Sequence, residues 1–329
     1  MKHGGDITQA MAQFGGTRES WLDFSTGINP LAWPIPHNLP NAIWQQLPTQ
    51  ADEITLLDAA RAAFSVPNDV TIVAAPGTQA LIQWVPRLVV DGPVAILAPT
   101  YSEHAMSWRE SGHEVIAVSS IDDIPEQARH VVLVNPNNPD GRIVDLAALA
   151  RTASVVAKRD GWLIIDEAFA DVVPAISAVG LCARYPVVIL RSFGKFYGLA
   201  GLRLGFALAS QPIANQIKKS IGPWACSGPA LVIGAAALRD DTWANATRAW
   251  LTQQTDALDD VLKQAGFTIA GGTSLYRLVR HRDALAIHER LAVQHIWCRR
   301  FDWDKDILRF GLPKDEASLA RLADALAHR

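Results

Sequence analysis

The chain has 329 residues, of which 49% are hydrophobic and 19% charged, and its formal net charge is −3. This length suggests about two domains, and the apolar content allows a large buried core and argues against wholesale disorder. The near-neutral balance argues against a protein that coats nucleic acid, because neutralising phosphates requires a basic excess. It still allows a local basic pocket for a small phosphate.

Three cysteines, Cys182, Cys226 and Cys298, lie far apart and form no C-x-x-C pair. Their number and spacing argue against a disulfide framework and a zinc cluster, and are typical of a reducing compartment. The opening MKHGGDITQA lacks the apolar core of a secretory signal, and no uncharged apolar run is long enough for a transmembrane helix. We therefore expect a soluble cytoplasmic protein without a metal site or a membrane partner.

Residues 1–30 are rich in glycine and turn residues and predict an arm before the first regular domain. After the arm, short β-branched apolar runs alternate with helical stretches. Because these runs are continuously apolar, they predict strands covered on both faces. We expect an α/β fold with a mostly parallel seven-stranded sheet wrapped by helices. The predicted strands are 71–75, 94–98, 114–118, 130–134, 162–166, 187–191 and 203–207.

After Ser210 the pattern changes. A helix with Lys218 and Lys219 leads to Gly222-Pro223, and a long helical stretch is predicted over 229–266. Further elements are predicted as a strand at 274–279, a helix at 283–294 and short strands near 296–299 and 307–310. We therefore predict a large domain over residues 31–220 and a smaller α+β domain over residues 221–329.

Two predicted strands end in segments that could bind a ligand, because ligands of doubly wound sheets lie outside the carboxyl ends of the strands. Gly77-Thr78-Gln79 opens a helix after the first strand, and backbone N–H groups at a helix start bind phosphate. An ordinary strand-to-helix turn would look the same. The loop 135–141 is broken by prolines and presents amide side chains, although such turns are common.

Asp166 ends a fully apolar strand. Burying a carboxylate there is costly without a cationic partner, which could be a metal, an arginine or a protonated ring nitrogen. A helix N-cap and the magnesium-associated aspartate of a P-loop ATPase are the alternatives.

Lys195 lies in a glycine-rich apolar stretch, where a solvated charge is a poor explanation. Gly194-Lys195 suggests a Walker A loop, but Phe196 stands where a hydroxyl must hold magnesium. The remaining explanation is that the lysine amine forms a Schiff base with a carbonyl. A pyridoxal cofactor needs that lysine, an acid at its pyridine nitrogen, a phosphate cradle and a stacking ring. The candidates are Lys195, Asp166, the cradle Gly77, Thr78, Gln79, Ser192 and Arg203, and the ring of Tyr101.

This ordered set resembles the fold-type I pyridoxal-phosphate enzymes, in the branch of histidinol-phosphate aminotransferase and threonine-phosphate decarboxylase. The likeness covers nearly the whole chain, and Lys195 and Arg203 stand in the similar segment K-x-x-G-L-A-G-x-R-x-G. It implies a two-domain aspartate aminotransferase-like fold. The resemblance further implies that Asn138 binds the cofactor's phenolic oxygen and Asp166 its pyridine nitrogen. It also implies that Ala168 lies under the cofactor ring and that Arg309 binds the substrate carboxylate.

The opening of the chain resembles one group within this branch. His3-Gly4-Gly5-Asp6 and the later segment 23–30, DFSTGINP, are similar to the start of the threonine-phosphate decarboxylases of cobalamin synthesis. In that group the N-terminal histidine and an arginine upstream of the carboxylate-binding one grip the substrate phosphate. Arg299 matches the position of this arginine better than its neighbour Arg300, which is the alternative. The substrate-binding residues implied in this way are His3, Gly4, Asn29, Arg299 and Arg309.

The sequence also departs from the family. Residues 166–168 form the family motif D-E-A. Phe169 replaces the tyrosine that aminotransferases of this branch place after this motif, which agrees with the decarboxylase group. The segment 44–48 lacks the tyrosine that reaches the neighbouring subunit's cofactor phosphate in aminotransferases, and the residue that replaces it stays open. Gly27 stands where some decarboxylases carry an asparagine near the substrate. Ser192 and Gly194 replace the usual threonine and serine, so fewer hydroxyls reach the phosphate.

The resemblance implies decarboxylation of L-threonine O-3-phosphate to (R)-1-amino-2-propanol O-2-phosphate, with Lys195 and Asp166 catalytic. It also implies a homodimer whose N-terminal arm covers the substrate site. A histidinol-phosphate-type aminotransferase is the alternative, because the reaction depends on which substrate bond stands perpendicular to the cofactor ring. A P-loop-like ATPase lacks its Walker A motif, and a cofactor-free binding module would not be yellow. We expect no nucleic-acid partner.

Overall fold

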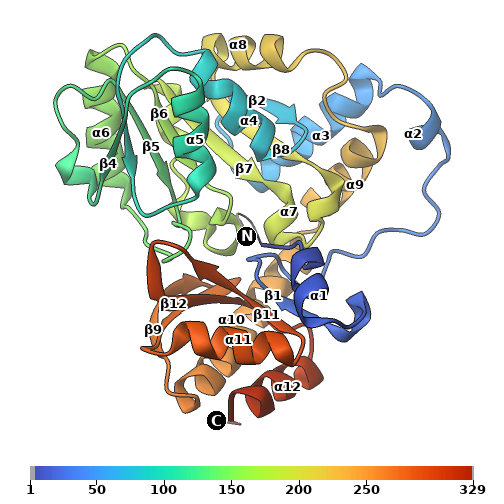
Figure 1. The fold of residues 1–329 in the computed structure, drawn as a ribbon. Coiled ribbons are helices and arrows are strands. Elements are labelled where there is room, and N and C mark those ends of the chain that lie inside the picture. Colours follow the sequence, from blue (N-terminus) through green and yellow to red (C-terminus); the bar gives the residue numbers. More distant parts are fainter. Residues whose placement is uncertain (1–3, 328–329) are drawn as a thin grey trace. The chain divides into compact units, whose positions relative to one another are not determined.

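The computed structural model describes residues 4–327, which divide into two compact units (Figure 1). The large unit comprises residues 33–138 and 142–243, and the small unit the rest. The second division thus falls after residue 243, whereas the sequence places a domain boundary near 220. The helix over residues 228–238 accounts for this difference, because a Cβ added at Gly234 would lie 3.0 Å from Leu56 Cδ1 in the large unit.

The large unit contains a seven-stranded sheet in the order β2-β8-β7-β6-β5-β3-β4. β8 is antiparallel to both of its neighbours, and the other pairs are parallel, which confirms the predicted mostly parallel sheet. Its strands are β2 (Val70–Ala75), β3 (Val94–Leu97), β4 (Val115–Val118), β5 (His130–Val134), β6 (Leu163–Asp166), β7 (Val187–Ser192) and β8 (Gly205–Ser210). β8 begins two residues later than predicted, because Arg203 adopts a left-handed conformation with φ 54°.

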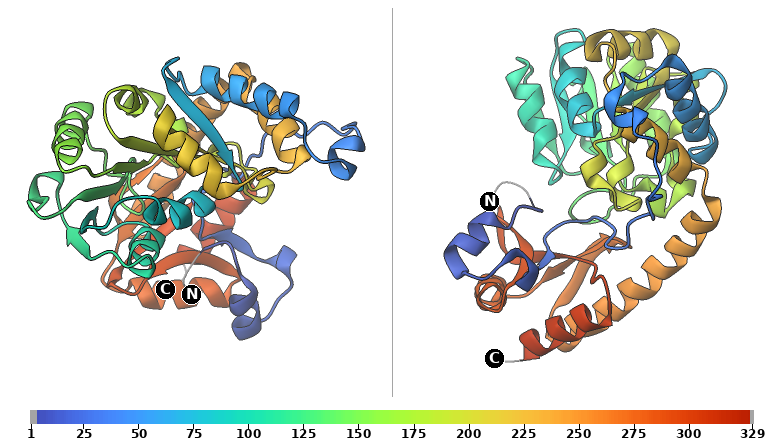
Figure 2. Two further views of the ribbon diagram at one scale, coloured as in Figure 1. Left: turned by 90° about the horizontal axis from the view of Figure 1, so that it is seen from above. Right: turned by 90° about the vertical axis from the view of Figure 1, so that its right-hand side faces the viewer.

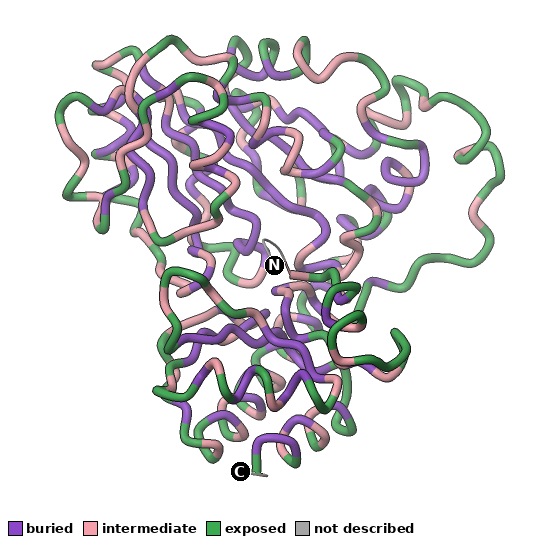
Figure 3. Tube along the Cα trace, viewed as in Figure 1, coloured by how far each residue is buried: buried purple, intermediate pink, exposed green. Residues whose placement is uncertain are grey.

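Helices lie on both faces of this sheet (Figure 2). One face packs against buried side chains of α4, α5 and α8, including Leu81, Trp108 and Ile217. Apart from the edge strand β4, the strands are almost entirely buried (Figure 3), which explains their continuous apolar sequences. The α-helices are α2 (Ala42–Gln45), α3 (Gln50–Ala63), α4 (Thr78–Trp84), α5 (Ser102–Glu110), α6 (Leu146–Lys158), α7 (Phe193–Phe196), α8 (Gln211–Ile221) and α9 (Gly228–Leu238). Short 3-10 turns are η2 (Val85–Arg87), η3 (Ile121–Asp123), η4 (Ala170–Val172), η5 (Pro174–Ile176), η6 (Val179–Ala183) and η7 (Ala200–Leu202).

The small unit is built on a five-stranded sheet in the order β1-β11-β12-β10-β9. The N-terminal segment is more regular than an arm, because β1 pairs in parallel with β11 and so forms an edge of this sheet. The strands are β1 (Leu22–Phe24), β9 (Thr268–Thr273), β10 (Tyr276–Arg280), β11 (Ile296–Phe301) and β12 (Asp304–Gly311). The helical elements are α1 (Thr8–Phe14), η1 (Arg18–Ser20), most of α10 (Asp241–Gln264), α11 (Ala284–Val293) and α12 (Glu316–Ala327).

Two sequence predictions in the second half of the chain were wrong in detail. The long helix over 229–266 is divided into α9 and α10, because Asp240 Oδ1 accepts the Trp243 N–H at 2.9 Å and starts a new helix. The strand over 274–279 is the second half of a hairpin. Ser274 and Leu275 form its turn, and the glycine-rich β9 before it carries too weak an apolar signal to be predicted.

Candidate active site

Most of the predicted cofactor-binding residues lie at one edge of the large sheet. β3, β5, β6 and β7 run in parallel, and β2 has the same direction because β8 is antiparallel to both β2 and β7. The carboxyl ends of these strands therefore share an edge, which is where doubly wound sheets bind ligands. The residues at or just beyond these ends are Gly77, Thr78, Tyr101, Asn138, Asp166, Ser192 and Lys195.

Asp166 is the last residue of β6, and its side chain is buried at the edge of the sheet. Its Oδ1 accepts the N–H of Ala168 at 3.0 Å, and its Oδ2 lies 3.0 Å from Nε2 of His104 in α5. Because an ionised carboxylate only accepts hydrogen bonds, the facing nitrogen of His104 is the donor. The buried charge thus has a partner on each oxygen, which offsets part of the cost of its desolvation.

Lys195 lies in α7, a single helical turn that follows β7 directly. Its Nζ lies 5.8 Å from the ring centroid of Phe169, a buried residue three positions after Asp166. Asp166 is paired in register with Leu190 on β7. The amine and the carboxylate therefore belong to the ends of two neighbouring strands, and an apolar ring lies beside the amine.

Two glycines shape the space between the start of α4 and Arg203. Gly77 has φ 82°, and a Cβ added to it would lie 2.7 Å from Nη2 of Arg203. A Cβ on Gly205 would lie 2.5 Å from the backbone nitrogen of Thr78. Ser192 pairs in register with Gly205 across β7 and β8. A guanidinium, a hydroxyl and helix-start N–H groups thus gather around backbone that only glycine allows to approach, a combination suited to a phosphate.

The predicted stacking ring is held by its own hydrogen bonds. Tyr101 precedes α5 directly, and its hydroxyl donates to Gln79 Oε1 at 3.2 Å. The amide of Gln79 in turn donates to Glu103 Oε2 at 3.0 Å. The side chain of Gln79, predicted to bind the cofactor, therefore orients the ring of Tyr101 through this hydrogen bond.

The asparagine-rich loop after β5 is braced by its side chains. Asn137 accepts a hydrogen bond from Thr100 Oγ1 at 2.6 Å and donates to the carbonyl of Pro99 at 2.9 Å. Asn135 Oδ1 accepts the N–H of Val144 at 2.9 Å. These bonds fix the backbone on both sides of the half-buried Asn138 and join the loop to the end of β3.

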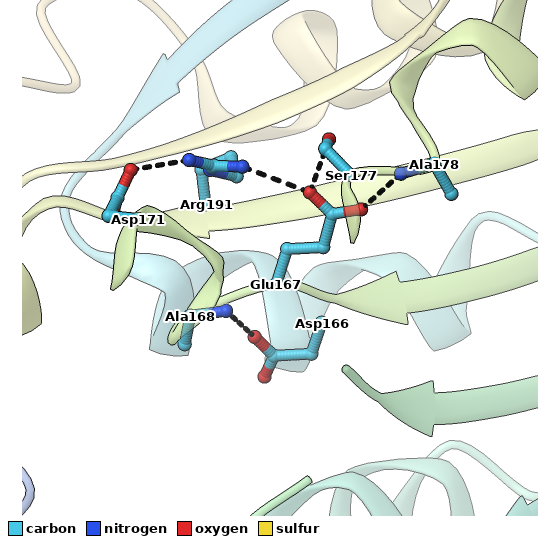
Figure 4. A network of polar contacts seen from close by, with 7 residues as sticks. All are labelled: Asp166, Glu167, Ala168, Asp171, Ser177, Ala178 and Arg191. Atoms are coloured by element: carbon cyan, nitrogen blue, oxygen red, sulfur yellow. Dashed lines mark hydrogen bonds and ion pairs between the residues drawn. The ribbon is translucent and has the colours of Figure 1, made fainter. Parts of the chain in front are cut away.

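A buried ion network lies on the other face of the sheet from Asp166 (Figure 4). Arg191 Nη1 lies 3.0 Å from Glu167 Oε2, and its Nη2 contacts Asp171. Glu167 also accepts hydrogen bonds from Ser177 Oγ and the N–H of Ala178, both at 2.7 Å. Burial alone would lower the pKa of Arg191, but the two neighbouring carboxylates raise it. The network links β7 to the segment that follows Asp166.

The predicted substrate-binding arginines lie on the small sheet. Arg309 on β12 is buried, donates from Nη2 to the carbonyl of Ser25 at 2.7 Å and lies over the ring of Tyr276 at 5.1 Å. Arg299 is its direct partner across β11 and β12, so the two guanidinium groups share a face. Arg300, one residue further, points to the opposite face. Burial, together with the charge of nearby Arg299, lowers the pKa of Arg309 to about 10.

The remaining predicted substrate residues belong to the N-terminal segment. Gly4 packs against Ser25, and Asn29 is buried with its Oδ1 accepting the N–H of Leu31 at 2.9 Å. His3 lies outside the described residues. The geometry therefore joins Gly4 and Arg309 through Ser25, and it gives Asn29 a role in shaping its own turn.

Sequence reasoning missed His104. Its position three residues after Tyr101 places it on the same face of a helix start, but this spacing does not point to Asp166 as its partner. Glu167 and Ser25 also gained roles only from the structure, since their partners are distant in sequence.

Sites of other kinds receive no support within residues 4–327. No group of three or more histidine, cysteine or acidic residues there could hold a metal ion. The helices of this part of the chain are too short or too polar to cross a membrane. Cys182, Cys226 and Cys298 are free and buried, and burial raises the pKa of Cys226 to about 12.

Comparisons with known proteins give similarity over almost the entire chain. The model of the family "Aminotransferase class I and II" matches residues 55–326. Threonine-phosphate decarboxylases of a Sinorhizobium species and of Pseudomonas aeruginosa are 43% and 39% identical, each over 99% of this chain and 97% of theirs. The crystal structure of histidinol-phosphate aminotransferase from Sinorhizobium meliloti with pyridoxal-5'-phosphate matches with TM-score 0.81 at 20% identity, over 98% of this chain and 93% of that one. The chain therefore belongs to the class I and II aminotransferase family, on the branch that includes the threonine-phosphate decarboxylases.

Proposed function

We propose that this protein is a pyridoxal-phosphate-dependent carboxy-lyase that converts L-threonine O-3-phosphate to (R)-1-amino-2-propanol O-2-phosphate in cobalamin biosynthesis. The observation that carries the proposal is the 43% identity to a threonine-phosphate decarboxylase over 99% of the chain. Similarity at this level and length includes both units, and therefore both the candidate cofactor residues and the candidate substrate residues.

The residues at the edge of the large sheet fit pyridoxal phosphate. The phosphate would lie against Arg203, Ser192 and the start of α4, which come close together because Gly77 and Gly205 have no Cβ atoms. A buried carboxylate, an amine beside an apolar ring and an oriented tyrosine complete the donor set that this cofactor requires. Asn138 and Ala168 would contact the cofactor ring at its oxygen and its underside.

When bound, pyridoxal phosphate supplies an electron sink that stabilises negative charge at the substrate Cα. Asp166 would hold the proton at the pyridine nitrogen, because its ionised carboxylate favours the charged form of a partner base. His104 and the N–H of Ala168 keep that carboxylate in one orientation. Lys195 would first bind the cofactor through Nζ and later return a proton from Nζ to the substrate Cα.

The arginines of the small unit would bind the two anionic groups of the substrate. We assign the α-carboxylate to Arg309, and the phosphate to Arg299 and His3. Arg299 is favoured over Arg300 because it shares a face with Arg309. By holding the substrate in one orientation, these contacts would decide which bond at Cα is broken.

The second candidate is an aminotransferase that acts on a phosphorylated amino acid or amino alcohol. The structural similarity to a histidinol-phosphate aminotransferase favours it. Phe169 argues against it, because the aminotransferases of this branch carry a tyrosine there. The two reactions share the cofactor and differ in their products.

The proposal extends to assembly and location. A cytoplasmic homodimer is supported by the family resemblance, by free cysteines and by exposed apolar side chains of the large unit such as Trp44, Leu47 and Trp224. Within it, residues 1–30 would serve the substrate site, residues 31–220 the cofactor and residues 221–329 the substrate carboxylate. Light scattering on the purified protein measures the number of subunits directly.

Product analysis tests the proposed reaction. The purified protein is loaded with pyridoxal phosphate and given L-threonine phosphate, and in parallel histidinol phosphate with 2-oxoglutarate. We expect carbon dioxide and amino-propanol phosphate from the first mixture, and no keto product from the second. Glutamate formation in the second mixture without carbon dioxide in the first would replace the decarboxylase with the aminotransferase.

A further inference from the structure

Ser25 is a fully buried residue directly after β1, and each of its polar atoms has a partner. Its carbonyl accepts Nη2 of Arg309 at 2.7 Å. Its hydroxyl accepts the N–H of Gly5 at 2.9 Å and donates to Asp23 Oδ1 at 2.5 Å. Its own N–H donates to the same carboxylate oxygen at 2.8 Å. One serine thus bonds both Gly5 near the chain start and an arginine 284 positions away.

Gly4 lies directly against the same carbonyl. A Cβ added to Gly4 would lie 2.4 Å from the oxygen of Ser25, 2.9 Å from its carbonyl carbon and 3.0 Å from its Oγ. The constraint at Gly4 is therefore space, since its φ lies outside the left-handed range, whereas Gly5 has φ 90°. A methyl group at Gly4 must move the atom to which Arg309 is bonded.

Arg309 has strict requirements on its orientation. Its guanidinium is buried, lies over the ring of Tyr276 and is the cross-strand partner of a second cation, Arg299. A guanidinium binds a carboxylate best through two parallel N–H groups, so its plane must be correct. The carbonyl of Ser25, 2.7 Å from Nη2, and the ring of Tyr276 together fix that plane.

We propose that Ser25 is a positioning residue for the substrate carboxylate: its carbonyl sets the plane of Arg309, and its hydroxyl holds the backbone of Gly5 at the same place. This inference rests on the proposed function, in which Arg309 binds that carboxylate. It links the two glycines near the chain start to the D-F-S segment some 20 residues later. These residues form one local cluster around Ser25, in which Asp23 orients the hydroxyl.

The test compares two variants in this cluster with two matched controls. Gly4→Ala pushes on the carbonyl, and Ser25→Ala removes the hydroxyl while keeping the carbonyl. Gly180→Ala is the control for an added methyl, because a Cβ added to Gly180 would have nothing within 4 Å of it. Ser20→Ala is the control for a lost hydroxyl, because Ser20 Oγ also has two partners, the carbonyl of Thr17 at 2.8 Å and His295 Nδ1 at 3.1 Å.

Two ligands separate an effect on Arg309 from general damage. We measure KM for L-threonine phosphate and the inhibition constant of 1-amino-2-propanol phosphate, which lacks the carboxylate. Gly4→Ala should raise KM about 10- to 100-fold, as expected for a misplaced binding group, with a change of less than about twofold in the inhibition constant. Ser25→Ala should shift KM in the same direction by a smaller factor, and the controls should match the wild type. An equal loss of affinity for both ligands, or an unchanged KM in Gly4→Ala, would overturn the inference.

A measurement without substrate keeps this inference separate from the proposed function. Residue-resolved hydrogen exchange, followed by NMR, reports the N–H of Gly5 directly. We expect slow exchange in the wild type and Ser20→Ala, and fast exchange in Ser25→Ala. Should the wild type fail to decarboxylate threonine phosphate, the proposed function falls and the assignment of Arg309 falls with it, while the exchange result still decides whether Ser25 holds the backbone of Gly5. Equal exchange in all variants would refute that part.

Discussion

His104 Nε2 and Asp166 Oδ2 lie 3.0 Å apart, and both side chains are almost fully buried. His104 extends from α5 and Asp166 from the end of β6, so the contact joins a helix to the sheet edge on which the proposed cofactor depends. Removing the histidine would leave the buried carboxylate with the N–H of Ala168 on its other oxygen. The orientation of the carboxylate should then be less well defined.

We therefore expect His104→Leu to weaken binding of pyridoxal phosphate about 10- to 100-fold, since a buried charged group that loses a hydrogen-bond partner costs about 1–3 kcal/mol. Titration of the apoenzyme with the cofactor, followed by absorbance, measures the change. His104→Gln retains an N–H donor and should recover part of the affinity. Equal affinity in the leucine variant and the wild type would show that the contact has no role in cofactor binding.

Lys195→Ala should remove the covalent link to the cofactor. The yellow absorbance band of the bound cofactor should disappear, and the decarboxylation rate should fall on the order of 10⁴-fold, because both attachment and proton return depend on this amine. Absorbance spectroscopy and a carbon dioxide assay measure the two effects. Lys158→Ala removes an exposed lysine at the end of α6 and serves as the control. A variant at Lys195 with an unchanged spectrum would disprove the assignment of the lysine.

Much of the large unit was predictable, because its strands are buried on both faces and are therefore continuously apolar. The residues at their carboxyl ends then follow from the rule that parallel strands end at one edge. His104 escaped prediction because its partner, Asp166, is 62 positions away, and pairing over such a distance leaves no local pattern. Gln79 illustrates the converse case, since its position in the chain was informative and its hydrogen bonds to Tyr101 and Glu103 were not predictable.

The small unit was harder to predict for physical reasons. β9 contains Gly271 and Gly272, both with positive φ, which weaken the strand signal, so only the second strand of its hairpin was found. The division of α9 from α10 depends on one capping aspartate, Asp240, which an apolar pattern does not register. β1 is three residues long and is stabilised by pairing with β11 at the other end of the chain.

Arg191→Met should destabilise the large unit strongly. The substitution leaves Glu167 and Asp171 buried without their cation, and breaking a buried ion pair in this way costs about 3–5 kcal/mol. Urea unfolding measures the loss, and the triple change Arg191→Met, Glu167→Gln and Asp171→Asn should recover part of it by removing the uncompensated charges. Lys218→Met breaks the exposed pair with Glu53 and should cost at most about 1 kcal/mol. Similar losses in the two single variants would contradict this account of the buried network.

His130 is fully buried on β5 and is held as the neutral ring. Its Nε2 faces the carbonyl of Val90 at 2.8 Å and donates to it, whereas its Nδ1 accepts the N–H of Trp162 at 3.0 Å. Adding a proton at Nδ1 would break the second bond. Burial lowers the pKa of His130 to about 4, and the bond to Val90 offsets only part of this effect.

This arrangement predicts a loss of stability in acid. The unfolded chain takes up a proton at His130 near pH 6.5 and the folded chain near pH 4, so the unfolded state binds more protons between these values. The contribution of His130 is therefore complete above pH 6.5 and is lost as the pH falls toward 4. His130→Gln should flatten the decrease in unfolding free energy between pH 7 and pH 5, as measured by urea unfolding. The exposed His37→Gln should leave the slope unchanged, and a His130→Gln variant that keeps the full wild-type slope would assign the acid sensitivity to other groups.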